Sequence, residues 1–200
     1  MNIKTASNDY PISDTLRRRW SPRAFNGQPV GNETLQRLFE AARWAPSASN
    51  LQPWRFIIGE KGTDTYDKIF GSLVEFNKLW AGTAPLLMLA LTKKTNNRDE
   101  PNDSADYDLG QAVANLTFQA TAEGIFVHQM GGFNANDIRI LFNIPDYFSI
   151  ATAIAVGYLG NPEILHENLK KMEITGRERL KASDLVFTGT FGQNTDIFNQ

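Results

Sequence analysis

The chain has 200 residues, a formal net charge of −2 at pH 7, 42% hydrophobic residues and 21% charged residues. This size suits one domain with a substantial hydrophobic core. The near-balanced charge gives no reason to expect nucleic acid or an anionic membrane as a partner. Cysteine is absent, which excludes disulfides, thiolate metal ligands and a cysteine nucleophile, and the two histidines argue against a histidine-rich metal site.

The sequence shows no signal for export or for membrane insertion. Residues 1–9 lack the apolar core of a signal peptide. The strongest apolar run, residues 84–91, is far shorter than the about 20 residues that a membrane-spanning helix needs. We therefore expect one cytoplasmic domain over residues 1–200, with a flexible arm at residues 1–11.

An arginine cluster follows this arm. Ser13 or Asp14 can cap a short helix that runs through Trp20. Four arginines fall within seven residues there, with no acidic residue among them: Arg17, Arg18, Arg19 and Arg23. Guanidinium groups bind phosphate oxygens in a fork geometry, so the cluster suits a phosphate. The alternative is a solvated basic helix face, which is the commoner origin of a charge run.

A helix, a turn and a strand come next. Asn32 can cap a helix whose apolar residues recur at helical spacing, and Pro46 ends it. Between Pro46 and Pro53 lies a turn with four small polar side chains: Ser47, Ser49, Asn50 and Gln52. Such groups can hydrogen-bond a flat polar ligand, and the prolines limit the freedom of the backbone between them. The alternative is an ordinary connecting loop.

The remaining pattern predicts an α+β fold. We expect strands at 54–60, 85–92 and 150–158, which form a sheet with helices on its faces. Helices are expected at 64–80, 104–123 and 134–142, with another starting near 162. The 64–80 helix either packs on the core or covers a substrate. The many small residues of the 104–123 helix would let a second subunit approach closely, which favours a symmetric dimer.

The turn also carries a resemblance. Ala-Arg-Trp-Ala-Pro-Ser-Ala-Ser-Asn-Leu-Gln-Pro-Trp-Arg-Phe, at residues 42–56, resembles the corresponding stretch of nitroreductase-like flavoproteins. In that family the turn lies against FMN at a dimer interface. The resemblance therefore implies that five residues approach the flavin: Pro46, Ser47, Ala48, Asn50 and Gln52.

The arginine cluster resembles a second motif of the same family. Arg19-x-Ser21-x-Arg23-x-Phe25 is similar to the family's Arg-x-Ser-x-Arg/Lys-x-Phe. The resemblance implies that Arg19 and Ser21 contact the FMN phosphate and ribityl region. Arg23 would approach the pyrimidine side of the ring, where a positive charge stabilises the anionic reduced flavin. Trp20 holds a slot that is often basic or Ser-like in the family, and it is a further cofactor-binding candidate.

Two later segments extend the resemblance to most of the chain. His-Gln-Met-Gly-Gly-Phe, at residues 128–133, is similar to the family segment that passes the dimethylbenzene and N5 edge of the flavin. It implies backbone contacts from Gln129, Met130, Gly131 and Gly132, whereas His128 alone is more typical of a packed structural residue. The tail after Gly176 resembles the closing segment that binds FMN phosphate, with Arg179 as the matching residue and Arg177 as the second. Residues 188–200 would then reach a partner subunit.

The resemblance covers residues 16–192 and implies a nitroreductase-like three-layer α+β fold with a mixed, mainly antiparallel sheet and an intertwined homodimer. It implies FMN as cofactor, NADH or NADPH as electron donor, and ping-pong reduction of electron-poor acceptors such as nitroaromatics, quinones or enones. No protein residue is assigned as catalytic, because FMN carries the hydride. The alternatives are dehalogenation, flavin fragmentation or peptide oxidation on the same scaffold, or a non-catalytic flavin-binding protein. If the arginines near both ends meet one phosphate, the fold must bring the ends together.

Overall fold

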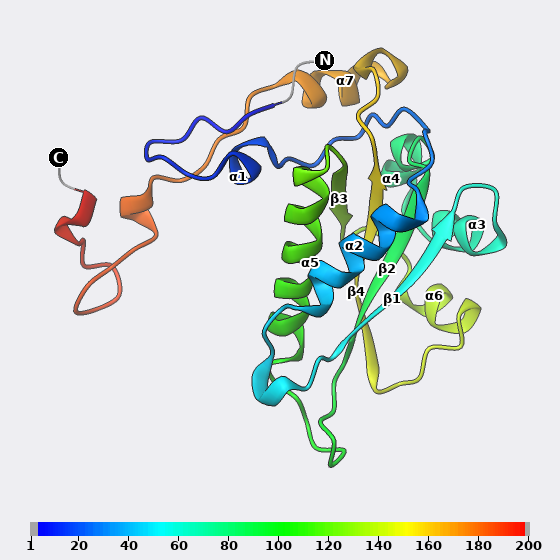
Figure 1. Ribbon diagram of the computed structural model, residues 1–200, viewed down its shortest axis with the longest axis horizontal. Coiled ribbons are helices and arrows are strands. Elements are labelled where there is room, and N and C mark those ends of the chain that lie inside the picture. The colour runs from blue at the N-terminus through cyan, green and yellow to red at the C-terminus, as the bar shows by residue number, and fades with distance from the viewer. Residues whose placement is uncertain (1–3, 199–200) are drawn as a thin grey trace.

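The computed structural model describes residues 4–198 and shows an α+β domain built on one sheet (Figure 1). The strands are β1 (Trp54–Glu60), β2 (Leu86–Lys93), β3 (Phe126–Met130) and β4 (Phe148–Gly157). The α-helices are α1 (Asp14–Arg18), α2 (Asn32–Arg43), α3 (Asp64–Gly71), α4 (Glu75–Ala81), α5 (Ala105–Ala122), α6 (Ala135–Leu141) and α7 (Glu167–Ile174). Short 3-10 turns are η1 (Ala48–Asn50), η2 (Pro162–Ile164), η3 (Ala182–Asp184) and η4 (Asp196–Phe198).

The sheet has the strand order β1-β2-β4-β3. β2 pairs with β1 on one side, with Leu89 opposite Ile57, and with β4 on the other, with Met88 opposite Ile154. β3 completes the sheet beside β4, with His128 opposite Ala155. Every pairing of these strands is antiparallel, so the sheet in residues 4–198 is more uniform than the mixed order expected.

Helices cover both faces of the sheet, which confirms the three-layer arrangement (Figure 1). Successive side chains of a strand point to opposite faces. On β2, Leu87 and Leu89 belong to the core beneath α3, α4 and α6, whereas Leu86 and Met88 belong to the core beneath α2 and α5. β2 is buried along nearly its whole length, because it lies between two layers of helices.

Four local features differ from the sequence expectation. The first helix, α1, ends at Arg18 and does not run through Trp20. The predicted 64–80 helix is interrupted between α3 and α4, because Leu73 pairs with Phe133 and the Val74 N–H donates to the Gly132 carbonyl oxygen at 3.1 Å. The expected strands omitted β3, which forms an edge of the sheet. Gly31, and not Asn32, is the N-cap of α2.

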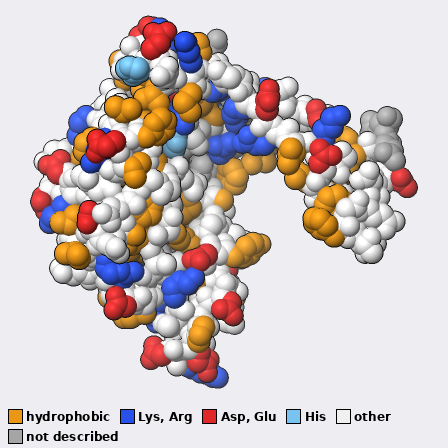
Figure 2. Space-filling view, turned by 180° about the vertical axis from the view of Figure 1, so that it is seen from behind, with side chains coloured by type: hydrophobic (Ala, Val, Ile, Leu, Met, Phe, Trp, Pro, Cys, Tyr) orange, Lys and Arg blue, Asp and Glu red, His pale blue; other side chains and the backbone are white. Residues whose placement is uncertain are grey.

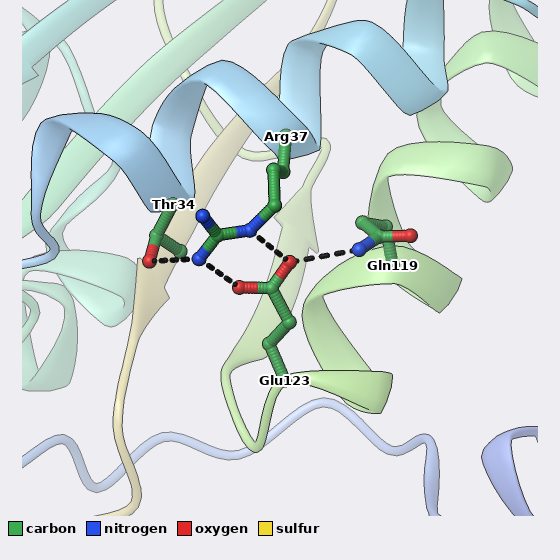
Figure 3. A network of polar contacts seen from close by, with 4 residues as sticks. All are labelled: Thr34, Arg37, Gln119 and Glu123. Atoms are coloured by element: carbon green, nitrogen blue, oxygen red, sulfur yellow. Dashed lines mark hydrogen bonds and ion pairs between the residues drawn. The ribbon is translucent and has the colours of Figure 1, made fainter.

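A polar network joins α2 to the end of α5, as Figure 3 shows. Arg37 Nε and Nη2 donate to Glu123 Oε1 and Oε2 at 2.9 and 2.8 Å. Arg37 Nη2 also donates to Thr34 Oγ1 at 3.1 Å, and Gln119 Nε2 donates to Glu123 Oε1 at 2.7 Å. The hydrogen bonds from Arg37 are the main reason that the pKa of Glu123 lies below its ordinary value, against the opposing effect of burial.

We expect Glu123→Gln to lower the melting temperature near pH 7 and to have much less effect near pH 3. A carboxyl whose pKa is lowered by folding stabilises the protein above its unfolded pKa, about 4.3. That stabilisation is lost as the pH falls through the folded-state pKa. Thermal unfolding followed by circular dichroism measures both differences, with exposed Glu60→Gln as the control. An equal loss of melting temperature at both pH values would contradict a stabilising role for the ionised Glu123 in this network.

The two terminal segments run side by side, away from the sheet (Figure 1). Near the N-terminus, Lys4 Nζ donates to the Met172 carbonyl oxygen at 3.0 Å, and the Ala6 N–H donates to the Arg17 carbonyl oxygen at 2.8 Å. After α7 the chain leaves the body as an extended arm, on which Phe191 is 95% exposed. The expected arms at 1–11 and 188–200 include residues 1–3 and 199–200, which lie outside the described residues.

The helices described within residues 4–198 all lack the combination of length and apolar character that crossing a bilayer requires.

Candidate functional site

The terminal segments and the body enclose a hollow of about 620 Å³, which we call the arginine hollow. Arg19 and Ser21 reach it from the N-terminal segment, and Arg177 and Arg179 reach it from the segment after α7. Gln129 of β3 and residues of α5 line the other side. Figure 2 shows basic side chains gathered where the arm meets the body. The fold therefore brings arginines from the two ends of the chain to one concave surface.

Positive charge is crowded in this hollow. The pKa of Arg19 is lowered, first by burial and then by the nearby Arg179. The pKa of Arg177 is lowered by burial, then by Arg19 and by Arg179. Both effects penalise the charged form of groups that remain protonated at neutral pH. An anion placed among these guanidinium groups would relieve their mutual repulsion.

Arg177 is bound mainly to the backbone of the other terminal segment. Its Nη2 donates to the Arg17 carbonyl oxygen at 2.8 Å, and its Nη1 donates to the Arg19 carbonyl oxygen. These carbonyls lie at the C-terminal end of α1, where the helix leaves acceptors without intrahelical partners. Arg177 thus fastens the two segments together. Arg179 is exposed, and its Nη1 donates to the Glu178 carbonyl oxygen at 2.7 Å.

The residues around Arg23 are packed against β3. His128 is buried, its Nδ1 lies 2.8 Å from the Pro22 carbonyl oxygen, and its ring lies 4.3 Å from that of Trp80. Burial lowers the pKa of His128 to about 4, so it is neutral at pH 7 and the structure gives it a packing role. The Arg23 guanidinium lies 5.9 Å from the centroid of the Trp80 ring. Trp20 is 6% exposed and packs on the core rather than lining the hollow.

The turn between Pro46 and Pro53 is held in an unusual backbone conformation. Ser49, Asn50 and Gln52 have φ values of 49°, 54° and 47°, in the left-handed region. Such conformations cost on the order of 1–3 kcal/mol each for residues other than glycine, and they cluster at functional sites. Ser47 Oγ accepts the Gln52 N–H at 3.1 Å, and Gln52 Nε2 donates to the Asn50 carbonyl oxygen at 3.0 Å.

A buried carboxylate on α5 anchors this turn. Asp108 is 2% exposed, and its Oδ2 accepts the Ala48 N–H at 3.1 Å. The side chains of the turn largely face outward: Pro46, Ala48 and Asn50 are exposed. The turn therefore presents an ordered polar surface to solvent.

Within one chain the turn and the arginine hollow are separate. The turn is anchored at Asp108, whereas Thr117 of the same helix lines the hollow. Nine residues of α-helix span about 14 Å. Figure 1 places the turn beyond the start of α5 and the terminal segments at the other end of that helix. The structure brings Arg19, Arg177 and Arg179 together in the hollow, whereas Arg23 does not line it. The predicted turn lies apart from these arginines.

The two adjacent glycines differ in their surroundings. A Cβ on Gly131 would meet no atom within 4 Å, whereas a Cβ on Gly132 would lie 2.7 Å from Val74 Cγ2 and 2.9 Å from Asn77 Nδ2. The Gly132 carbonyl oxygen also accepts from Asn77 Nδ2 at 2.9 Å. Gln129 is exposed beside the hollow, and the side chain of Met130 lies in the core. The Val74 and Asn77 side chains thus pack closely over Gly132, whereas Gly131 faces open space.

Residues 16–76 and 60–158 match the family model described as Nitroreductase family. The chain belongs to the nitroreductase family. A curated Mycolicibacterium smegmatis protein, named uncharacterized 15.4 kDa protein in ask 5'region, is 30% identical over 145 residues, which are 69% of this chain and 97% of that protein. An Archaeoglobus fulgidus protein, provisionally named NADH dehydrogenase/NAD(P)H nitroreductase, is 25% identical over 144 residues, which are 70% of this chain and 80% of that protein.

Solved structures of related proteins share the architecture of this nitroreductase-family chain. A structure described as an oxidoreductase containing FMN has a TM-score of 0.90 and 33% identity, covering 97% of this chain and 100% of that chain. A nitroreductase family protein from Clostridium difficile 630 has a TM-score of 0.67 and 26% identity, covering 86% of this chain and 94% of that chain. These likenesses confirm the expected nitroreductase-like α+β fold.

The glycine pair of this nitroreductase-family chain gives a matched test. We expect Gly132→Ala to lower the free energy of unfolding by about 1–3 kcal/mol, because the added methyl group overpacks the site. Gly131→Ala is expected to stay within about 0.5 kcal/mol of the parent, as surface changes usually do. Urea unfolding of both variants measures the difference. Equal losses in the two variants would contradict the assignment of Gly132 to packing.

Sequence reasoning missed two buried acids of this nitroreductase-family site. Asp108 supports the turn, and Glu173, at 3% exposure, accepts backbone N–H groups of the N-terminal segment. Each stands in a helix among ordinary polar residues, so no local pattern distinguishes it. Among residues 4–198, no group of three or more His, Asp or Glu side chains is arranged to hold a metal ion.

Proposed function

We propose that this nitroreductase-family protein is an FMN-dependent NAD(P)H oxidoreductase that reduces nitroaromatics, quinones or similar electron-poor acceptors. The observation that carries the proposal is the meeting of Arg19 and Arg179, from opposite ends of the chain, in one hollow with Ser21. A related structure of high similarity is described as containing FMN. The name of the Archaeoglobus fulgidus relative supports NADH or NADPH as the electron donor.

The chemistry of the arginine hollow fits a flavin phosphate. Guanidinium and hydroxyl groups donate hydrogen bonds to phosphate oxygens, and Arg19 Nη1 already lies 3.5 Å from Ser21 Oγ. Arg177 Nε is buried without a hydrogen-bond partner within the described chain. The single carboxylate among the lining residues is that of Asp9, which is exposed. The lining therefore sets three guanidinium groups against one carboxyl group, which suits an anionic ligand.

The residues of the proposed flavin site would bind the cofactor or stabilise its charge, and none of them would carry out the redox step. Bound FMN would supply the redox chemistry of a ping-pong cycle between NAD(P)H and the acceptor. Arg19, Ser21 and Arg179 would hold its phosphate. Arg23, whose Nε is buried without a hydrogen-bond partner in the described residues, would place a positive charge where negative charge develops on reduction.

The proposal includes a homodimer with one flavin site at each end of the interface. One chain does not bring its own turn to its own arginine hollow, so a second copy would supply the turn that faces the ring. The arm after α7 supports this arrangement, because it carries apolar side chains that a single chain leaves in solvent: Leu180, Leu185, Val186, Phe191 and Ile197. Apolar surface of this kind is typical of interfaces.

Anaerobic spectroscopy tests the proposed function. We expect the protein to bind FMN, NADH or NADPH to bleach the visible band of the oxidised flavin, and a nitroaromatic or quinone to restore it. FMN binding without bleaching by either nicotinamide would indicate a non-catalytic flavin-binding protein. Bleaching without recovery by any such acceptor would indicate other chemistry on the same scaffold. A protein that binds no FMN would contradict the proposal altogether.

A further inference from the structure

Glu173 is a buried acid that links α7 to the N-terminal segment, and both neighbouring segments contribute arginines to the arginine hollow. It lies near the end of α7, and its side chain is shielded from solvent. Its Oε1 accepts the N–H of Arg23 at 2.8 Å and that of Ala24 at 3.0 Å, and its Oε2 accepts the Arg23 N–H at 3.0 Å. A buried carboxylate is costly unless it is hydrogen-bonded, so these backbone groups are its compensation.

The hydrogen bonds of Glu173 fix a short, critical stretch of backbone. Arg23 and Ala24 follow directly on Arg19 and Ser21, which line the hollow. Beyond them, the Ala24 carbonyl oxygen accepts the Gly160 N–H at 2.8 Å, which ties the stretch to the end of the sheet. Glu173 thus links this N-terminal motif to the last helix of the chain.

A second link lies four residues further along the chain. Arg177 donates to the carbonyl oxygens of Arg17 and Arg19. Arg177 therefore holds the start of the N-terminal motif, and Glu173 holds its end. The guanidinium groups of Arg19, Arg177 and Arg179 repel one another. A firm attachment between the segments is needed to hold these like charges within reach of one phosphate.

We propose that Glu173 is a positioning residue of the phosphate site, whose carboxylate sets the Arg19–Arg23 backbone in register with Arg177 and Arg179. This inference rests on the proposed function, because it takes the phosphate to be that of FMN. Glu173 does not touch the flavin, and it acts through the backbone N–H groups that it binds. Its loss should therefore weaken the phosphate contact of Arg19 most, and the ring contact only as far as Arg23 shifts with the same stretch.

Comparison of FMN with riboflavin, which lacks the phosphate, separates positioning from general structural support. We expect Glu173→Gln to weaken FMN binding by about tenfold or more, since a hydrogen bond to a charged group is lost and an NH₂ group faces the Arg23 N–H. Riboflavin affinity should fall much less, because riboflavin shares only the Arg23 contact at the ring, so the ratio of FMN affinity to riboflavin affinity falls. Glu167→Gln, an exposed acid on the same helix, is the matched control and should change neither affinity.

Further measurements keep the test decisive. Glu173→Asp retains the charge and should give an intermediate ratio, which provides a reading if Glu173→Gln does not fold. In the wild-type protein the N–H groups of Arg23 and Ala24 should exchange slowly with deuterium. An unchanged ratio in folded Glu173→Gln, an equal loss of both flavins, or fast exchange of these amides would overturn the inference while the proposed function stands. A wild-type protein that binds neither flavin would overturn both.

Discussion

Replacing Arg19 or Arg179 with alanine is expected to weaken FMN binding by about 10- to 100-fold, the range for losing a charge-assisted hydrogen bond to phosphate. Both side chains line the arginine hollow, and each would donate to the phosphate from a different end of the chain. Quenching of flavin fluorescence on titration with protein measures the affinity. The same titration with riboflavin should show no change, because riboflavin has no phosphate.

The neighbouring Arg18 provides the control for these two variants. It pairs with Asp14 at 3.4 Å on α1 and does not line the hollow. Arg18→Ala removes the same charge from the same region, so it reports the effect of net charge alone. If it weakens FMN binding as much as Arg19→Ala does, the effect is general electrostatics. Unchanged flavin occupancy in both Arg19→Ala and Arg179→Ala would remove the phosphate assignment.

Gly160→Ala is expected to lower the free energy of unfolding by about 3 kcal/mol, at the upper end of the cost of overpacking. A Cβ there would lie 2.5 Å from the backbone carbon and 2.6 Å from the carbonyl oxygen of Phe25. Backbone cannot rotate away as a side chain can. A protein of this size loses about 2–4 °C of melting temperature per kcal/mol, so the melting temperature should fall by about 6–12 °C.

Gly176→Ala is the control for this change, because a Cβ at Gly176 meets no atom within 4 Å. Gly160→Ala should also weaken FMN binding, since Gly160 holds the backbone of Ala24 close to the arginine motif. Calorimetry of both variants with and without FMN measures the two effects together. A Gly160→Ala protein as stable as Gly176→Ala would show that Phe25 does not pack closely here.

Much of the fold could be predicted, because periodicity and caps are local signals. The strand at 54–60 has the predicted bounds, and α6 begins after the expected Asn134 cap. The break between α3 and α4 could not be read from the sequence, because it depends on Leu73 pairing with Phe133, 60 residues away. β3 was missed because it has only five residues, and its place in the sheet depends on pairing with β4, which comes later in the chain.

The same distinction applies to the site: features within a short stretch could be predicted, and those that depend on distant residues could not. The arginine cluster and the proline-bounded turn are visible in the sequence because each lies within a few residues. The roles of Asp108 and Glu173 depend on backbone partners 60 and about 150 residues away, so neither acid stands out. Trp20 was placed among the cofactor contacts by resemblance, and the structure puts its side chain in the core. The Met130 side chain is also in the core, and its predicted contact through the backbone stays a prediction.

The distance between the turn and the hollow is the reason that the proposed function includes a dimer. Asp108 holds the turn at the start of α5, whereas the arginines lie beside the later part of that helix. A flavin that contacts both would therefore span two copies of the chain. A monomeric FMN complex with full activity would contradict this arrangement, and sedimentation of the FMN complex measures it.

A crystal structure of the wild-type protein with FMN tests the central claim most directly. The account predicts that the phosphate lies within hydrogen-bond distance of Arg19 and Arg179 of one protomer, while the Pro46–Pro53 turn of its partner faces the ring. A phosphate bound away from these arginines, or a ring that contacts no turn from a second copy, would contradict it.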